Sequence, residues 1–186
     1  MEHDLRSYIS WGQFYCGLAQ VRHGEHHNGL DLMRAGMSGM DKINFRILWT
    51  AHLGHLAWAL ASAGKVGEAM DVLSKAFRAV DQYGEKAYEV ERHRLRGDLL
   101  WQRGAVKEAE IEFCRAVEIA RAQKAKSWEL RAATSLARLH AERGDKAQAL
   151  EVLSPVQSWF IEDFDTADLR AARTLLHTLE LDAGVG

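Results

Sequence analysis

The sequence has few of the residues that stop helices or cross-link chains. Among its 186 residues there is one proline, Pro155, and two cysteines, Cys16 and Cys114, which lie far apart and form no CxxC pair. This spacing gives no support for a disulfide framework or a cysteine-based zinc site. We therefore expect two reduced, buried thiols in a cytoplasmic protein.

An excess of one charge and a long apolar run are also missing. The 24 Lys and Arg residues nearly balance the 26 Asp and Glu residues, for a net charge of −2. This balance gives no strong field for nucleic acid or an anionic membrane. The longest apolar stretch, 56–61, is far too short to span a bilayer, and residues 1–11 lack the apolar core of a signal peptide. We therefore expect neither nucleic acid nor membrane as a partner.

Strand patterns are missing as well, whereas helix patterns are abundant. No run alternates Val, Ile and Thr with polar residues, and long stretches are rich in Ala, Leu, Glu, Arg and Lys, which favour helices. With 47% hydrophobic residues the chain has enough apolar surface for a core. These features predict an all-α protein.

A repeat of 40 residues organises the chain, because Gly24, Gly64, Gly104 and Gly144 have similar surroundings. Five further positions are small or apolar in all four copies. Small residues stand seven before the glycine, at Gly17, Ala57, Gly97 and Ala137, and five after it, at Gly29, Ala69, Ala109 and Ala149. Large apolar residues stand nine after it, at Met33, Leu73, Phe113 and Leu153, and sixteen before it, at Tyr8, Leu48, Tyr88 and Trp128. The position twelve after the glycine holds Gly36, Ala76, Ala116 and Val156.

Each copy reads as a helical hairpin. The glycine takes the turn, where a left-handed backbone is favourable without a Cβ. Small residues let the two helices approach closely, and the large residue nine positions after the turn fills the seam between them. One hairpin cannot bury its apolar face alone. We predict a right-handed α-solenoid of four such hairpins with a C-terminal capping helix, in a single domain of residues 1–186, with repeats at 5–41, 42–84, 85–124 and 125–162.

The end of the chain carries two local signals. Residues 166–182 predict the capping helix, with Asp165 or Thr166 as its N-cap. Its apolar stripe consists of Leu169, Ala172, Leu175, Leu176 and Leu179. Pro155 falls inside the second helix of repeat four, so we expect a kink or break near Ser154.

Three histidines in "VRHGEHHNGL", His23, His26 and His27, raise the question of a metal site. They flank the turn at Gly24, and Glu25 is the only neighbouring carboxylate, whereas structural zinc needs four converging ligands. We expect no metal here, and packing or solvent exposure for His52 and His55. The sequence has no phosphate loop, nucleophile elbow or HExxH motif. We therefore expect a protein that is not an enzyme and has no cofactor.

The small-residue columns around the turn and the large apolar column in the second helix resemble the tetratricopeptide (TPR) repeat. The usual TPR period is about 34 residues, so the six extra residues would lengthen the helices or the links. HEAT repeats, with a period of about 40–47 residues, are the second interpretation.

The TPR resemblance implies a concave groove lined by the first helix of each hairpin. The candidate partner-binding residues on this face are Trp11, Phe14, Trp58, Arg94, Asp98, Trp101, Arg131 and Arg138. Trp58 and Trp101 would hold an apolar side chain, and Arg131 and Arg138 a carboxylate. In the alternative, the tryptophans pack between repeats, Arg94 pairs with Glu91 and Asp98, and Arg138 pairs with Glu142.

The segments at 93–123, 126–139 and 153–176 also resemble the C-terminal TPR region of bacterial multidomain regulators that carry a predicted ATPase and an adenylyl or guanylyl cyclase. Three functions therefore stay open: a scaffold that binds a protein or peptide, a sensory segment of such a regulator, and a self-association module. For the free chain we expect a monomer or weak homodimer.

Overall fold

The computed structural model describes residues 2–86, 88–161 and 165–182. Within these ranges the chain forms nine α-helices and no strand, which confirms the all-α prediction. None of these helices is both long and apolar enough to cross a membrane. The helices are α1 (Glu2–Arg22), α2 (His26–Lys42), α3 (Trp49–Ser62), α4 (Val66–Tyr83), α5 (Glu89–Gln102), α6 (Val106–Ala122), α7 (Lys126–Glu142), α8 (Lys146–Gln157) and α9 (Ala167–Asp182).

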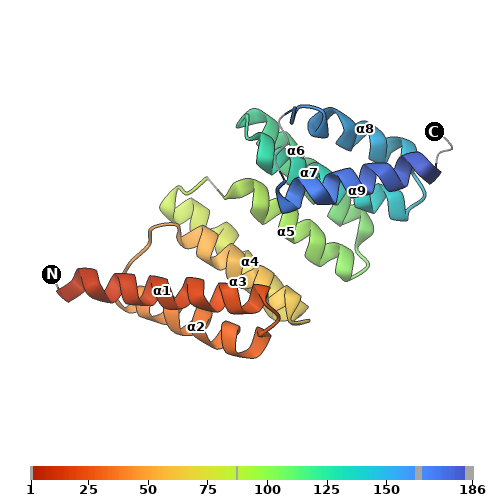
Figure 1. The fold of residues 1–186 in the computed structure, drawn as a ribbon. Coiled ribbons are helices and arrows are strands. Elements are labelled where there is room, and N and C mark those ends of the chain that lie inside the picture. Colours follow the sequence, from red (N-terminus) through yellow and green to blue (C-terminus); the bar gives the residue numbers. More distant parts are fainter. Residues whose placement is uncertain (1, 87, 162–164, 183–186) are drawn as a thin grey trace. The chain divides into compact units, whose positions relative to one another are not determined.

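The chain consists of two compact units, Met1–Tyr88 and Glu89–Gly186. The first unit contains the hairpins α1–α2 and α3–α4, and the second contains α5–α6, α7–α8 and the final helix α9. In each hairpin the two helices pack side by side, as Figure 1 shows. The prediction that all repeats form one domain stays a prediction.

The hairpin turns are built alike. Gly24, Gly64, Gly104 and Gly144 have φ values of 90°, 74°, 78° and 81°. In each turn the residue after the glycine donates its N–H to a carbonyl five residues earlier, over 2.9–3.0 Å. This bond satisfies a carbonyl that the end of the helix would otherwise leave without a partner. The glycine recurs because a Cβ would strain the left-handed backbone at this point.

The small residues of the repeat are the places where helices touch. A Cβ on Gly17 of α1 would lie 2.5 Å from the carbonyl oxygen of Gly29 on α2, and a Cβ on Gly29 would lie 2.6 Å from that of Gly17. The large residues nine after each turn glycine are at most 1% exposed, as expected. The position sixteen before the glycine is different, because Tyr8 and Leu48 are 69% and 43% exposed. This column is not a core column in the first two repeats.

The helix α9 keeps the register of the repeat. The first helices α1, α3, α5 and α7 each end two residues before a turn glycine, and α9 ends at Asp182, two residues before Gly184 of the sequence. The Thr166 hydroxyl accepts a hydrogen bond from the Leu169 N–H at 3.3 Å, which confirms Thr166 as the cap. Leu169, Ala172, Leu176 and Leu179 are buried. The capping helix is thus a fifth first helix.

Two local expectations are wrong, the break in the second helix of repeat four and the buried cysteines, whereas a kink near Ser154 stays a prediction. The helix α8 is not broken at Ser154 but runs on to Gln157, because Pro155 lies on its exposed side, where water can reach the carbonyl left without its N–H partner. It has 12 residues, whereas α2, α4 and α6 have 17, 18 and 17. Cys16 and Cys114 are free thiols, as expected, but they are exposed and not buried. Each lies one position away from the buried face of its helix.

A buried histidine lies in the core of the first unit. His52 of α3 is 0% exposed, and its Nε2 accepts a hydrogen bond from Trp11 Nε1 of α1 at 2.9 Å. The Phe14 ring meets its imidazole edge to face, 4.8 Å away between centroids. Burial lowers the pKa of His52 and outweighs the nearby Leu48 carbonyl and Glu85 carboxylate, which favour the charged form. His52 is therefore a neutral core residue.

The contact between α1 and α2 predicts opposite effects for two glycines of one helix. Gly17→Ala should lower the free energy of unfolding by about 1–3 kcal/mol, because the new methyl group meets backbone atoms of α2. Gly12→Ala should raise it by about 0.5–1 kcal/mol, because no atom lies within 4 Å and alanine favours the helix. Urea unfolding followed by circular dichroism measures both, and equal effects would contradict the close contact.

The buried His52 predicts that stability falls in acid. Its pKa is lower in the folded than in the unfolded chain, so below an unfolded pKa of about 6.5 the unfolded state binds more protons. The free energy of unfolding should therefore decline as the pH falls from about 7.5 to about 5.5, and His52→Gln should remove part of this decline. His27→Gln is the control, since that side chain is 92% exposed. An unchanged pH slope in His52→Gln would disprove this role.

Candidate partner-binding site

In the first unit the predicted groove residues separate into core and surface. Phe14 is fully buried, so its side chain is not accessible to a partner, and the sequence-based assignment has to be corrected. It is buried because α3 covers this side of α1 and places His52 against the ring. Trp11 remains 37% exposed. Trp58 is half-buried, and the guanidinium of Arg22 lies 5.8 Å from the centroid of its ring.

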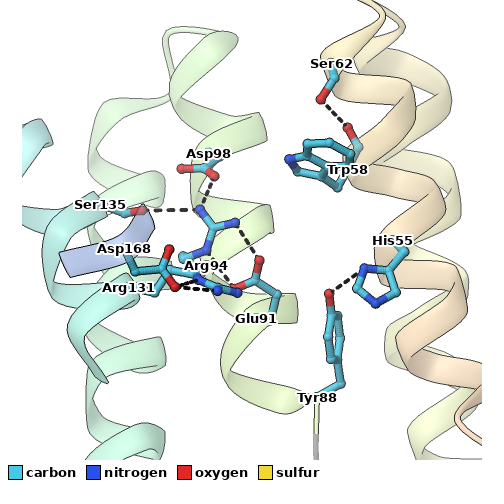
Figure 2. Close-up of polar contacts among 10 residues, drawn as sticks. All are labelled: His55, Trp58, Ser62, Tyr88, Glu91, Arg94, Asp98, Arg131, Ser135 and Asp168. Carbon is cyan, nitrogen blue, oxygen red and sulfur yellow. Dashed lines mark hydrogen bonds and ion pairs between the residues drawn. The ribbon is translucent and has the colours of Figure 1, made fainter. Parts of the chain in front are cut away.

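A tyrosine links the first unit's last residues to α3. The hydroxyl of Tyr88 hydrogen-bonds to Nδ1 of His55 at 3.1 Å (Figure 2). The Tyr88 ring lies so close to Gly54 that a Cβ there would be 2.4 Å from it. His52 and His55 are both packing residues, as expected. Tyr88, which the sequence did not single out for this role, therefore packs against α3.

Of the three histidines near the first turn, His23 and His27 are exposed and His26 is half-buried. His23 is exposed in the turn, and His26 and His27 begin α2, as their spacing around Gly24 predicts. Across the described part of the chain, no group of three or more His, Cys, Asp or Glu side chains is arranged to hold a metal ion. The absence of a resident metal stays a prediction.

In the second unit three charged residues of α5 form a cluster. Arg94 contacts both oxygens of Glu91 at 2.7 and 2.8 Å and Oδ2 of Asp98 at 2.5 Å, and it also lies 3.3 Å from the Ser135 hydroxyl of α7 (Figure 2). The side chains of Glu91 and Arg94 are 7% and 12% exposed. The alternative in which Arg94 pairs with Glu91 and Asp98 is therefore present, and the guanidinium of Arg94 is bound by carboxylates of its own chain.

The buried charges of this cluster shift one another's pKa values. Burial by itself would lower the pKa of Arg94, but the carboxylates of Glu91 and Asp98 outweigh it and raise that pKa above its usual value. Burial raises the pKa of Asp98, against the opposing effect of Arg94. The arginine therefore stays charged, and the cations Arg94 and Arg138 favour the ionised form of Asp98 against the effect of burial on its pKa.

Arg131 of α7 already holds a carboxylate. Its Nη2 and Nε lie 2.6 and 3.1 Å from Oδ2 of Asp168 on α9, and its Nη1 lies 3.9 Å from Glu91. The sequence predicted a carboxylate for Arg131 but assigned it to a partner, whereas α9 supplies one from the same chain. The 40-residue period could have predicted this pair. Asp168 lies 40 residues after Trp128, so the two residues hold equivalent positions, and the Trp128 ring also contacts Arg131.

A surface pocket of about 360 Å³ lies beside Trp101. It is lined by Asp98, Trp101 and Gln102 of α5 and by Glu142 of α7. The Trp101 ring is half-buried and meets the ring of Phe113 edge to face at 6.2 Å, which holds one side of it in place. Sequence reasoning selected Asp98 and Trp101 for this surface but treated Glu142 only as a pairing partner of Arg138.

Arg138 and Glu142 lie on the same exposed surface of α7 without pairing. Both side chains are accessible, and among the residues that the structure describes neither forms an ion pair. Arg138 is close enough to Asp98 for its charge to favour the ionised carboxylate. Asp98 and Trp101 therefore line one pocket, and Arg138, which is accessible, lies near Asp98 without lining that pocket.

Comparison with known proteins supports the fold. The sequence matches no protein-family model, and no curated protein gives a significant match. Two crystal structures are similar, both of a Podosopora anserina protein described as kinesin light chain with nearly identical TPR-like repeats. The first has 19% identity to this chain and a TM-score of 0.69, and the aligned region covers 96% of this chain and 88% of the other. The other, a substituted form of that protein, has 20% identity and a TM-score of 0.70, with 99% and 89% covered.

These similarities extend over nearly the whole chain, but at 19% and 20% identity they concern the fold alone. They agree with the all-helical repeat fold described above. The chain is an all-helical protein with the fold of a TPR-like repeat solenoid.

Proposed function

We propose that the chain is a non-enzymatic protein-interaction module that binds a peptide or partner domain on the exposed face of its first helices. The observation that carries this proposal is the pocket beside Trp101, which opens between α5 and α7. Trp and Arg are the residue types most often found at the energetic centre of protein interfaces. A half-buried tryptophan with an accessible arginine beside it fits that pattern.

The proposed surface differs between the two units. In the first unit it contains the accessible rings of Trp11 and Trp58, and in the second it contains Asp98, Trp101 and Arg138. Phe14, Arg94 and Arg131 have other tasks, since they pack the core or hold carboxylates of the same chain. Phe14 and Arg94 support the surface from beneath, whereas the Arg131 side chain is 38% exposed and is held by Asp168.

Two other functions remain as alternatives. A sensory role in a larger regulator rests on the resemblance of residues 93–123, 126–139 and 153–176 to bacterial ATPase and cyclase proteins, and a phosphate loop encoded upstream in frame would support it. Self-association is favoured by the exposed apolar side chains of Tyr8 and Ile9 on α1, which are 69% and 54% exposed. Sedimentation that shows a monomer at every concentration would remove that alternative.

The main proposal predicts that short peptides bind at Trp101. A random peptide library displayed on phage would be selected on the wild-type chain, and the enriched peptides measured by fluorescence anisotropy. Trp101→Ala should raise their Kd by about thirtyfold or more, which corresponds to the loss of a central tryptophan contact of about 2 kcal/mol. Trp159→Ala is the matched control, since its ring is 57% exposed and lies away from the pocket.

A second variant protects this test against misfolding. Gln102→Trp should fill the pocket from its exposed rim without disturbing Phe113, and should weaken the same peptides. Circular dichroism and the melting temperature show whether each variant is folded. Failure of the library to enrich any peptide, or equal binding by all variants, would reject this surface as a binding site.

A further inference from the structure

The pocket beside Trp101 is lined by acidic side chains without basic ones among the described residues. Two of its four side chains, Asp98 and Glu142, are carboxylates, Gln102 contributes an amide, and Trp101 contributes an aromatic ring. Among the described residues no basic side chain lines it. Its volume of about 360 Å³ is at the small end of ligand pockets, which are typically about 300–1,000 Å³. A pocket of this size suits one side chain of a partner better than a large ligand.

Both carboxylates have capacity left for a cation. Arg94 contacts only Oδ2 of Asp98, and among the described residues Oδ1 has no hydrogen-bond partner. Glu142 is accessible, and no lysine or arginine of the described chain comes within ion-pair distance of it. Since a carboxylate accepts several hydrogen bonds, the pocket presents acceptors from α5 on one side and from α7 on the other.

We propose that this pocket binds the cationic side chain of a lysine or arginine from the partner protein, an inference that rests on the proposed function. The aliphatic stem of the side chain packs on the Trp101 ring, and its charged end lies between Asp98 and Glu142. A cation over a tryptophan face is attracted by the negative face of the ring, and the two carboxylates add charge-assisted hydrogen bonds.

The other classes of side chain fit less well. An acidic side chain would meet two carboxylates of its own sign. An apolar one would remove water from Asp98 and Glu142 without offering them a hydrogen bond, which is unfavourable. Arg138 does not line the pocket but lies near Asp98, so it works against a cation and is suited to an acidic residue elsewhere on the partner. A cation in the pocket therefore predicts that loss of the Glu142 charge weakens binding.

The peptides selected on the wild-type chain test this inference. They should share a lysine or arginine, and replacing it by norleucine or citrulline should raise the Kd by about tenfold, as expected for a lost charge-assisted interaction. Glu142→Gln should raise the Kd by about two- to fivefold, since that carboxylate is accessible to water. Glu151→Gln, an equal change of charge on the exposed side of α8, is the control.

The outcomes separate the inference from the proposed function. If Trp101→Ala abolishes binding but the peptides share no basic residue, the interaction module stands and the cationic ligand is wrong. The same holds if Arg138→Ala abolishes binding while Glu142→Gln has no effect, because the ligand is then anionic. If no peptide binds, both are rejected. The inference would be supported if the peptides share a basic residue and if its replacement and Glu142→Gln raise the Kd by less together than the product of their separate effects in a double-mutant cycle.

Discussion

The close contact between the two helices of a hairpin is the constraint on which the other features depend. At Gly17 and Gly29 the backbones of α1 and α2 touch with no room for a Cβ on either side. Alanine takes the equivalent place in other repeats, at Ala57 and Ala69, and is fully buried there. Because helices that approach this closely bury their large side chains on one shared seam, each hairpin presents a defined first-helix face.

This geometry explains the arrangement of charges in the second unit. The first helices α5, α7 and α9 follow one another in register, so residues at related positions meet: Arg94 with Ser135, and Arg131 with Asp168. The Arg94 cluster is largely buried, and removing one partner of such a cluster costs about 3–5 kcal/mol. Arg131 and Asp168 are over a third exposed, so their pair contributes only about 0–1 kcal/mol. The first cluster shapes the surface, and the second joins α9 to it.

The proposed site depends on the charged side chains that form no ion pair within the described chain. Arg94 and Arg131 are satisfied within the chain, whereas Arg138 and Glu142 lie one helical turn apart without pairing. Glu142 lines the pocket together with Trp101, whose ring meets that of Phe113. A rigid aromatic wall next to open charges favours specific binding, because little conformational entropy is lost when a ligand binds to it.

The sequence by itself determined the helices, the turns and the cap. Gly24 and its three equivalents marked the turns because only glycine takes the left-handed backbone without strain, and Thr166 marked the start of α9 because its hydroxyl can accept from the first turn. These are local effects, which a spacing of residues can reveal. It also predicted a partner-binding face that carries Asp98, Trp101 and Arg138.

Only the tertiary structure decided which side chains on that face are available. Phe14 and Trp11 are three residues apart on one helix, yet α3 buries the first and leaves the second accessible. Arg131 and Arg138 are both arginines of α7, yet within the described chain α9 brings a carboxylate, Asp168, only to the first. Burial and pairing depend on what a neighbouring helix places opposite each residue. That information lies in the packing of distant segments and is not contained in any local pattern.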